Sequence, residues 1–169
     1  MTFLATLADQ VRAADPDLGV DLDEEGLRLV LSGPGGRPRF VLGEEDGAVF
    51  LEGLWRLPLS PDTEEGVREL LLDVVRDGFE NHGWEVPVLL DGGPLSGRRV
   101  SRRWEDLVGR LVFAEAGPPS EAHFYKWHLR RTDEGDYVCR YERTLRGEEI
   151  DEFLRRGVES TGPFVIANA

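Results

Sequence analysis

The sequence predicts an α+β fold: an antiparallel sheet, formed by a meander and a C-terminal hairpin, packed by two to four helices. Apolar residues recur every three or four positions in two long stretches, which is the spacing of one helix face. Elsewhere, short apolar runs alternate with glycine, proline and acidic turn formers, as in strands joined by hairpins. With 169 residues and 40% hydrophobic content, the chain can bury a full core. We therefore expect a single domain spanning residues 1–169.

The first helix is predicted over residues 3–14. Its apolar side is Phe3, Leu4, Leu7, Ala8, Val11 and Ala14. Asp15-Pro16 ends it, because the residue before a proline avoids the helical region. Strand runs and turn-forming segments then alternate up to residue 58: strands 27–31, 39–42 and 49–55, and turns 32–36 and 44–47. This alternation predicts an antiparallel meander.

A second helix follows a dense start signal between Ser60 and Glu65. Either Ser60 caps the helix with Pro61 behind it, or Asp62 and Glu65 form a capping box. Its apolar positions are Val67, Leu70, Leu71, Val74, Val75 and Phe79. This pattern is one face of a helix that lies across the sheet. Residues 81–83 end the helix and residues 85–90 form another strand, in which Pro87 indicates an edge or an end position.

The segment 91–97 is the best candidate for an internal boundary, because turn formers are dense there and the charge balance changes. We take it as a long loop within one domain. Beyond it, apolar residues between Val100 and Leu111 have helical spacing, yet residues 107–114 could equally form a strand. The sequence therefore leaves open whether residues 101–114 are helix or strand.

The clearest hairpin joins residues 123–131 to residues 137–144 through Asp133-Glu134-Gly135, with glycine where positive φ is needed. This loop predicts a register with the cross-strand pairs Thr132–Asp136, Leu129–Cys139, Trp127–Tyr141, His128–Arg140 and Lys126–Glu142. One face would then be core, with Trp127 and Tyr141 together, and the other would face solvent. If the protein binds through this sheet, the expected contacts are Lys126, His128, Arg130 and Arg140. A last helix is expected over residues 147–156, stopped by Gly157.

All of the net charge of −13 lies in the first part of the chain. Residues 1–97 contain 20 Asp and Glu against 7 Arg, whereas residues 98–169 contain 13 acidic and 13 basic residues. A field of one sign attracts partners of the opposite sign. The acidic N-terminal half is therefore expected to face a partner, which we take to be another, basic, polypeptide. The arginines of 98–110 and the outward hairpin residues would suit nucleic acid or phosphate, but the overall charge opposes polyanions, so nucleic-acid binding is not expected.

No sequence pattern indicates a cofactor, a metal or a catalytic group. His82, His123 and His128 have no helical ligand spacing, and the last two are five residues apart, which places them on opposite faces of one strand. The glycine clusters lack the lysine of a phosphate-binding loop. We expect a non-catalytic protein without cofactor or metal. The alternative is a small enzyme, a hydrolase or nuclease, that uses His123 or His128 with a carboxylate such as Glu121.

The expected compartment is the cytoplasm. Cys139 is the single cysteine and cannot form an internal disulfide, which favours a reducing environment. Asp9 interrupts the apolar stretch that a signal peptide would need, and nowhere do 18 apolar residues run together. We expect no contact with a membrane.

Over residues 3–90, the order helix, meander, helix, strand and the acidic charge resemble small binding proteins. The chain is similar in these respects to type III secretion chaperones and YbjN-like peptide-binding domains and, more loosely, to small immunity proteins of bacterial toxin systems. The resemblance implies a protein that binds another polypeptide, often as a homodimer. It assigns no functional residue, since it rests on element order and charge.

Overall fold

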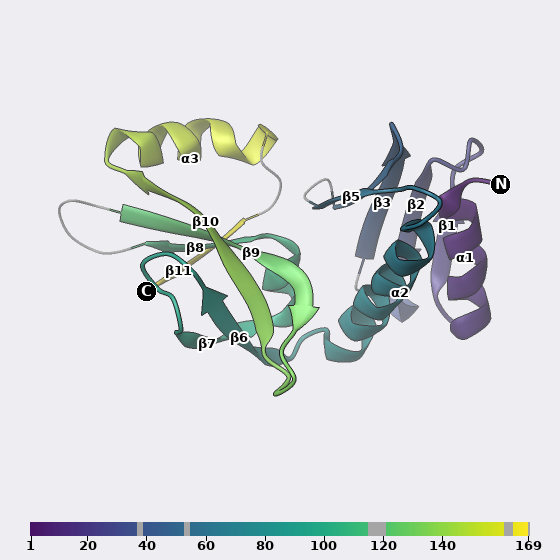
Figure 1. The fold of residues 1–169 in the computed structure, drawn as a ribbon, viewed down its shortest axis with the longest axis horizontal. Coiled ribbons are helices and arrows are strands. Elements are labelled where there is room, and N and C mark those ends of the chain that lie inside the picture. Colours follow the sequence, from purple (N-terminus) through teal and green to yellow (C-terminus); the bar gives the residue numbers. More distant parts are fainter. Residues whose placement is uncertain (37–38, 53–54, 115–120, 161–163, 169) are drawn as a thin grey trace. The chain divides into compact units, whose positions relative to one another are not determined.

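The computed structural model describes residues 1–36, 39–52, 55–114, 121–160 and 164–168. The chain forms two compact units, residues 1–80 and residues 81–169. Both combine helices with sheets rich in antiparallel pairs, so the predicted α+β class is confirmed (Figure 1). Segment 91–97 lies inside the second unit. That the whole chain is one domain stays a prediction, and each unit is described by itself.

The first unit contains, in order, α1 (Phe3–Ala14), β1 (Gly19–Leu22), β2 (Arg28–Ser32), the short 3₁₀ helix η1 (Pro34–Gly36), β3 (Arg39–Glu45), β4 (Ala48–Leu51), β5 (Trp55–Pro58) and α2 (Glu64–Asn81). Its strands pair in the order β1-β2-β3-β4-β5, each antiparallel to the next. The predicted meander is confirmed, with two differences. The sequence patterns did not indicate β1, and the strand predicted over 49–55 is instead two strands, β4 and β5.

Helix α1 has the bounds that the sequence predicts, and its N-terminus is tied to the sheet. The hydroxyl of Thr2 accepts a hydrogen bond from the backbone N–H of Ala5 (3.2 Å) and donates one to the carbonyl of Gly26 (2.7 Å). Glu44, which the sequence places in a solvated turn, instead belongs to β3. Its carboxylate accepts from the N–H of Leu4 at 3.2 Å, where a negative charge also complements the helix dipole.

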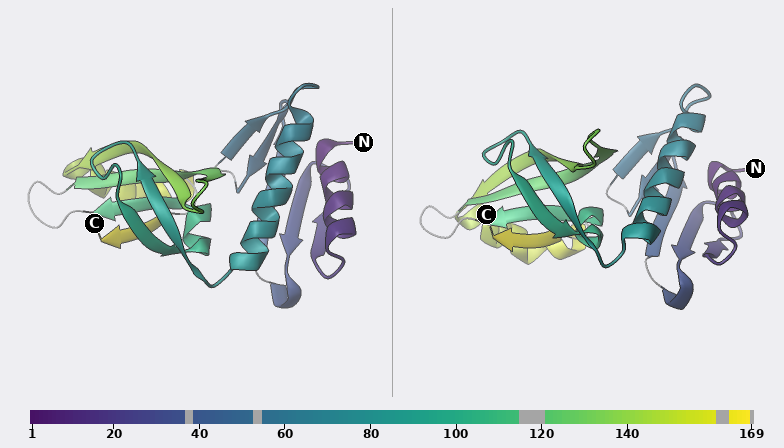
Figure 2. Two further views of the ribbon diagram at one scale, coloured as in Figure 1. Left: turned by 60° about the horizontal axis from the view of Figure 1, so that its bottom comes forward. Right: turned by 90° about the horizontal axis from the view of Figure 1, so that it is seen from below.

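Helix α2 begins at Glu64, later than either predicted start. Its buried residues are Leu71, Val74, Val75 and Gly78. The ring of Phe79 packs edge-on against Phe40 of β3, with centroids 5.7 Å apart. Phe40 and Glu44 are four residues apart in one strand, so they share a face. Because α1 contacts Glu44 and α2 contacts Phe40, both helices cover the same face of the meander (Figures 1 and 2).

The second unit contains β6 (Glu85–Asp91), β7 (Arg99–Arg103), the 3₁₀ helix η2 (Trp104–Val108), β8 (Arg110–Ala114), β9 (Glu121–Arg131), β10 (Tyr137–Arg146), α3 (Glu148–Ser160) and β11 (Phe164–Asn168). The strand order is β11-β8-β9-β10-β6-β7. The β10–β6 and β11–β8 pairs are parallel. The hairpin and the meander thus lie in two separate sheets. The sequence leaves residues 101–114 open between helix and strand, and the structure contains both: the 3₁₀ helix η2 is followed by strand β8.

Two expectations for this unit need correction. Strand β6 is not an edge strand, because it pairs with both β10 and β7, so of the two positions that Pro87 indicates only the end position agrees with the structure. Its pairing with β10 starts at Val88, so the missing N–H of Pro87 lies outside that ladder. Helix α3 passes Gly157 and ends at Ser160, which shows that a glycine alone does not stop a helix.

The hairpin register is confirmed at its loop and wrong beyond it. The N–H of Thr132 donates to the carbonyl of Asp136 at 2.8 Å, as predicted. After the Tyr137–Arg131 pair, however, the register shifts by two residues, so that Cys139 pairs with Trp127. Likewise, Tyr125 lies opposite Tyr141, and Lys126 lies opposite Arg140. The predicted pairs Leu129–Cys139, Trp127–Tyr141, His128–Arg140 and Lys126–Glu142 are therefore wrong. The cause is a β-bulge.

In this bulge, residues 128–130 of β9 lie opposite a single residue of β10. Leu129, at its centre, has φ of 56°, a left-handed conformation that non-glycine residues seldom adopt. No glycine marks the bulge in the sequence, so local patterns predict an unbroken register here.

The core of the second unit lies on both faces of β9. On one face, Trp127 packs edge-on against Trp104 (centroids 6.1 Å apart) and lies 5.5 Å from Tyr137. On the other, Phe124 packs edge-on against Phe153 of α3 at 4.7 Å. The core position of Trp127, which is 2% exposed, is confirmed, whereas Tyr141 is only half-buried.

Candidate functional site

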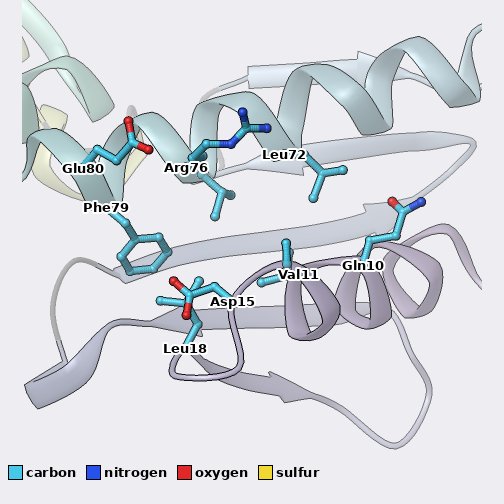
Figure 3. Close-up of a pocket in the computed structure, with 10 residues that line it drawn as sticks. Gln10, Val11, Asp15, Leu18, Leu72, Arg76, Phe79 and Glu80 are labelled. Atoms are coloured by element: carbon cyan, nitrogen blue, oxygen red, sulfur yellow. The ribbon is translucent and has the colours of Figure 1, made fainter.

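An apolar groove lies between α1 and α2 in the first unit (Figure 3). Its volume is about 470 Å³. Its floor is formed by Val11, Leu18, Leu72, Val75 and Phe79, and polar side chains surround it, namely Gln10, Asp15, Arg76 and Glu80. Figure 3 shows side chains of α2 and α1 directed toward each other across this space.

The groove exists because α2 is apolar over a wider arc than the sheet covers. Leu71 and Val74 are buried, whereas Leu72 and Phe79, which line the groove, are half-buried. Leu72 lines the groove but falls outside the apolar face that the sequence pattern predicts for this helix. The signal was the run of three leucines, 70–72, because three consecutive helix positions cannot all point at one sheet.

The surroundings of the groove are acidic. Residues 1–80 contain 18 Asp and Glu against 7 Arg. At the rim, Asp15 and Glu80 are exposed carboxylates. Among the described residues that line the groove, Arg76 is the one cation, and it forms an ion pair with Asp73 at 3.0 Å. The rim therefore offers negative charge beside an apolar floor.

The four predicted binding residues of the second unit do lie together. Lys126 and Arg140 are cross-strand neighbours, and His128 and Arg130 are exposed on the same strand as Lys126. Arg140 forms an ion pair with Asp91 (Nε to Oδ2, 3.4 Å). Partial burial lowers the pKa of His128, and the charges of Arg140, Arg130 and Lys126 lower it further, against an opposing effect of Asp91.

Of the predicted catalytic alternative, the structure brings His123 and Glu121 together but leaves His128 apart, on an exposed surface. The Nε2 atom of His123 lies 3.9 Å from a carboxylate oxygen of Glu121, and its Nδ1 atom lies 2.8 Å from the hydroxyl of Thr144. Glu121 also pairs with Arg146 at 2.5 Å. Because His123 is 1% exposed, a substrate would have to enter the core to reach it.

Other titratable groups form structural contacts. His82 lies 3.2 Å from Glu105. Cys139 is buried, and burial raises the pKa of its thiol to about 12. Within the described residues, no group of three or more His, Cys, Asp or Glu side chains could hold a metal ion. None of the described helices is both long and apolar enough to cross a membrane.

Comparisons of the chain with protein-family models, curated proteins and solved structures find no match. The likeness to secretion chaperones and immunity proteins therefore stays a prediction, and function has to be argued from the geometry.

Proposed function

We propose that the chain is a non-catalytic binding module, chaperone-like or immunity-like, whose acidic first unit receives a segment of another polypeptide. The observation that carries the proposal is the groove between α1 and α2, with its apolar floor and acidic rim. We expect its occupant to be an amphipathic segment that inserts apolar side chains and carries Lys or Arg beside them.

The shape and lining of the groove support a polypeptide occupant. Apolar positions of α2 line it at residues 72, 75 and 79, so the floor runs along more than one helical turn. Proteins that bind an amphipathic helix commonly present such a groove between their own helices. The volume of about 470 Å³ is in the range of sites that bury most of a bound group.

The charge of the first unit supports a basic occupant. Carboxylates at the rim would attract Lys or Arg flanking the inserted side chains. The whole of residues 1–80 also has an excess of acidic residues, 18 against 7 Arg. At low ionic strength this excess would accelerate the encounter between the first unit and a basic segment. We therefore expect the association rate to fall steeply with salt, while the dissociation rate changes little.

The experiment is a selection of peptides from a random displayed library on the immobilised full chain, followed by amide chemical-shift mapping of a selected peptide. We expect enriched peptides to combine Lys or Arg with apolar residues three or four positions apart, and their shift changes to centre on residues 10–18 and 72–80. Enrichment of acidic peptides, or shift changes confined to other residues, would contradict the proposal.

A further inference from the structure

The groove between α1 and α2 has two chemically different ends, because the two helices run in the same direction (Figures 1 and 3). Both helices terminate at one end of the groove. This acidic end contains Asp15, the C-cap of α1, and Glu80, the last residue but one of α2. Gln10 and Leu72 lie toward the other end. Charge is therefore concentrated at one end of an otherwise apolar groove.

The two carboxylates of the acidic end are not balanced by a cation. Both residues are exposed, and within the part of the chain that the structure describes, neither Asp15 nor Glu80 forms an ion pair. The Asp15 carboxylate accepts a hydrogen bond from the backbone N–H of Asp17 at 3.1 Å, which leaves its charge in place. Arg76 also lines the groove, but it pairs with Asp73 at 3.0 Å and not with Glu80. A ligand could therefore supply the missing positive charge.

The helix dipoles strengthen this polarity. A helix C-terminus carries a partial charge of about −0.5, and two such termini lie at the acidic end. Helix α2 has no basic residue in its last turn, and the one in α1, Arg12, pairs with Asp9 at 3.0 Å. The helix N-termini, by contrast, are already complemented by carboxylates. Glu44 accepts from the N–H of Leu4, and the first turn of α2 is acidic.

From this polarity we propose a direction of binding, which rests on the proposed function of the groove. The occupant binds as a helix antiparallel to α1 and α2, with Lys or Arg in its first turn beside Asp15 and Glu80. A helix N-terminus has free backbone N–H groups and a partial positive charge, and carboxylates are good acceptors for such groups. The antiparallel direction brings this terminus and the basic side chains to the acidic end together. The parallel direction would bring a third negative helix terminus there.

The length of the groove defines the occupant further. Leu72 and Glu80 are eight residues apart in α2, which is about 12 Å along the helix axis. An occupant helix covers this length with about two turns, so it would insert two or three apolar side chains spaced by three and four residues. The expected signature is therefore one or two basic residues, followed within about one turn by the first of these apolar residues.

The test uses a helical peptide of about 15 residues, with two lysines in its first turn and leucines spaced by three and four positions along one face. A nitroxide label is attached to either its first or its last residue, and paramagnetic broadening of the amide signals of the full chain is measured. We expect the label on the first residue to broaden residues 15–18 and 79–80 most. The label on the last residue should broaden residues 10 and 72 most.

The outcomes separate the direction from the groove itself. The opposite pattern, or equal broadening of both ends by each label, would overturn the antiparallel direction and leave the groove as a peptide site. Broadening confined to residues outside 10–18 and 72–80, or no binding of this peptide, would overturn both the direction and the proposed function.

Matched peptides and variants test the role of the acidic end. The reversed peptide, with its lysines in the last turn, should bind at least threefold more weakly, although lysine near a C-terminus makes it the more stable helix in isolation. Glu80→Gln should weaken binding of the first peptide about threefold or more. Glu69→Gln removes the same charge from an exposed position of α2 that does not line the groove, and should change the affinity by less than about 1.5-fold. Equal affinities of the two peptides, or equal effects of the two substitutions, would overturn the proposal.

Discussion

Trp127 of β9 lies directly opposite Cys139 of β10, and the bulge of residues 128–130 separates this pair from the hairpin loop. The Trp127 indole packs against Trp104 and Tyr137. It also donates its N–H to the carbonyl of Arg130. One side chain thus fills the core of the second unit and bonds the bulge, in which His128 and Arg130 are exposed.

Replacing Trp127 by alanine should lower the free energy of unfolding by about 3–5 kcal/mol, as removal of a large buried aromatic does. The matched control is His128→Ala, one residue away and exposed, which should change it by less than about 0.5 kcal/mol. Urea unfolding followed by circular dichroism measures both. Similar losses in the two variants would mean that the faces of β9 are assigned wrongly.

The thiol of Cys139 should be inert in the folded protein. Burial raises its pKa to about 12, so at pH 8 almost none of it is the reactive thiolate. A colorimetric disulfide reagent should label Cys139 in 8 M urea but not in native buffer. The unfolded chain releases this proton near pH 8.5, so the contribution of Cys139 to stability should decline as pH rises from about 8.5 toward the folded value. Rapid labelling of native protein would contradict its buried position.

In the first unit, Leu71→Ala should lower the free energy of unfolding by about 2–5 kcal/mol, because the Leu71 side chain of α2 is fully buried. Asp73, two residues on, has a side chain 71% exposed. Asp73→Ala should therefore shift the melting temperature only slightly. If calorimetry shows equal shifts for the two variants, α2 does not present the face described.

Gly93→Ala should destabilise the second unit. Gly93 has φ of 66°, and a Cβ atom there would lie 2.4 Å from the ring of Tyr141. We expect a loss of about 1–3 kcal/mol, since both the backbone and the ring would have to move. Gly97→Ala is a useful comparison, because its φ of 81° is similar but a Cβ atom would meet nothing within 4 Å. If Gly97→Ala lowers the free energy of unfolding as much as Gly93→Ala does, contact with the Tyr141 ring is not the cause of the loss.

Local patterns predicted the elements whose causes are local. Helix α1, the meander and the loop at Asp133-Glu134-Gly135 follow from periodicity and turn chemistry. The parallel pairing of β10 with β6 joins strands some fifty residues apart, and no local pattern encodes such a pairing. The bulge was missed because a leucine, not a glycine, adopts the left-handed conformation.

The candidate sites divide in the same way. The exposure of His128 and Arg130 was predictable, because alternation along β9 sets them apart from the buried Trp127 and Leu129. The groove was not, because it depends on the spacing of two helices over one sheet. Only the three consecutive leucines at 70–72 indicated that α2 has apolar residues outside its predicted apolar face.

The most direct test of polypeptide binding in the groove compares two charge reversals in the first unit. Glu80 belongs to the rim, whereas Glu24 is exposed in the turn after β1 and does not line the groove. Isothermal titration calorimetry of a selected basic peptide should give at least fivefold weaker binding to Glu80→Lys than to Glu24→Lys, although both carry the same net charge. Equal affinities for the two variants would contradict the groove as the binding site.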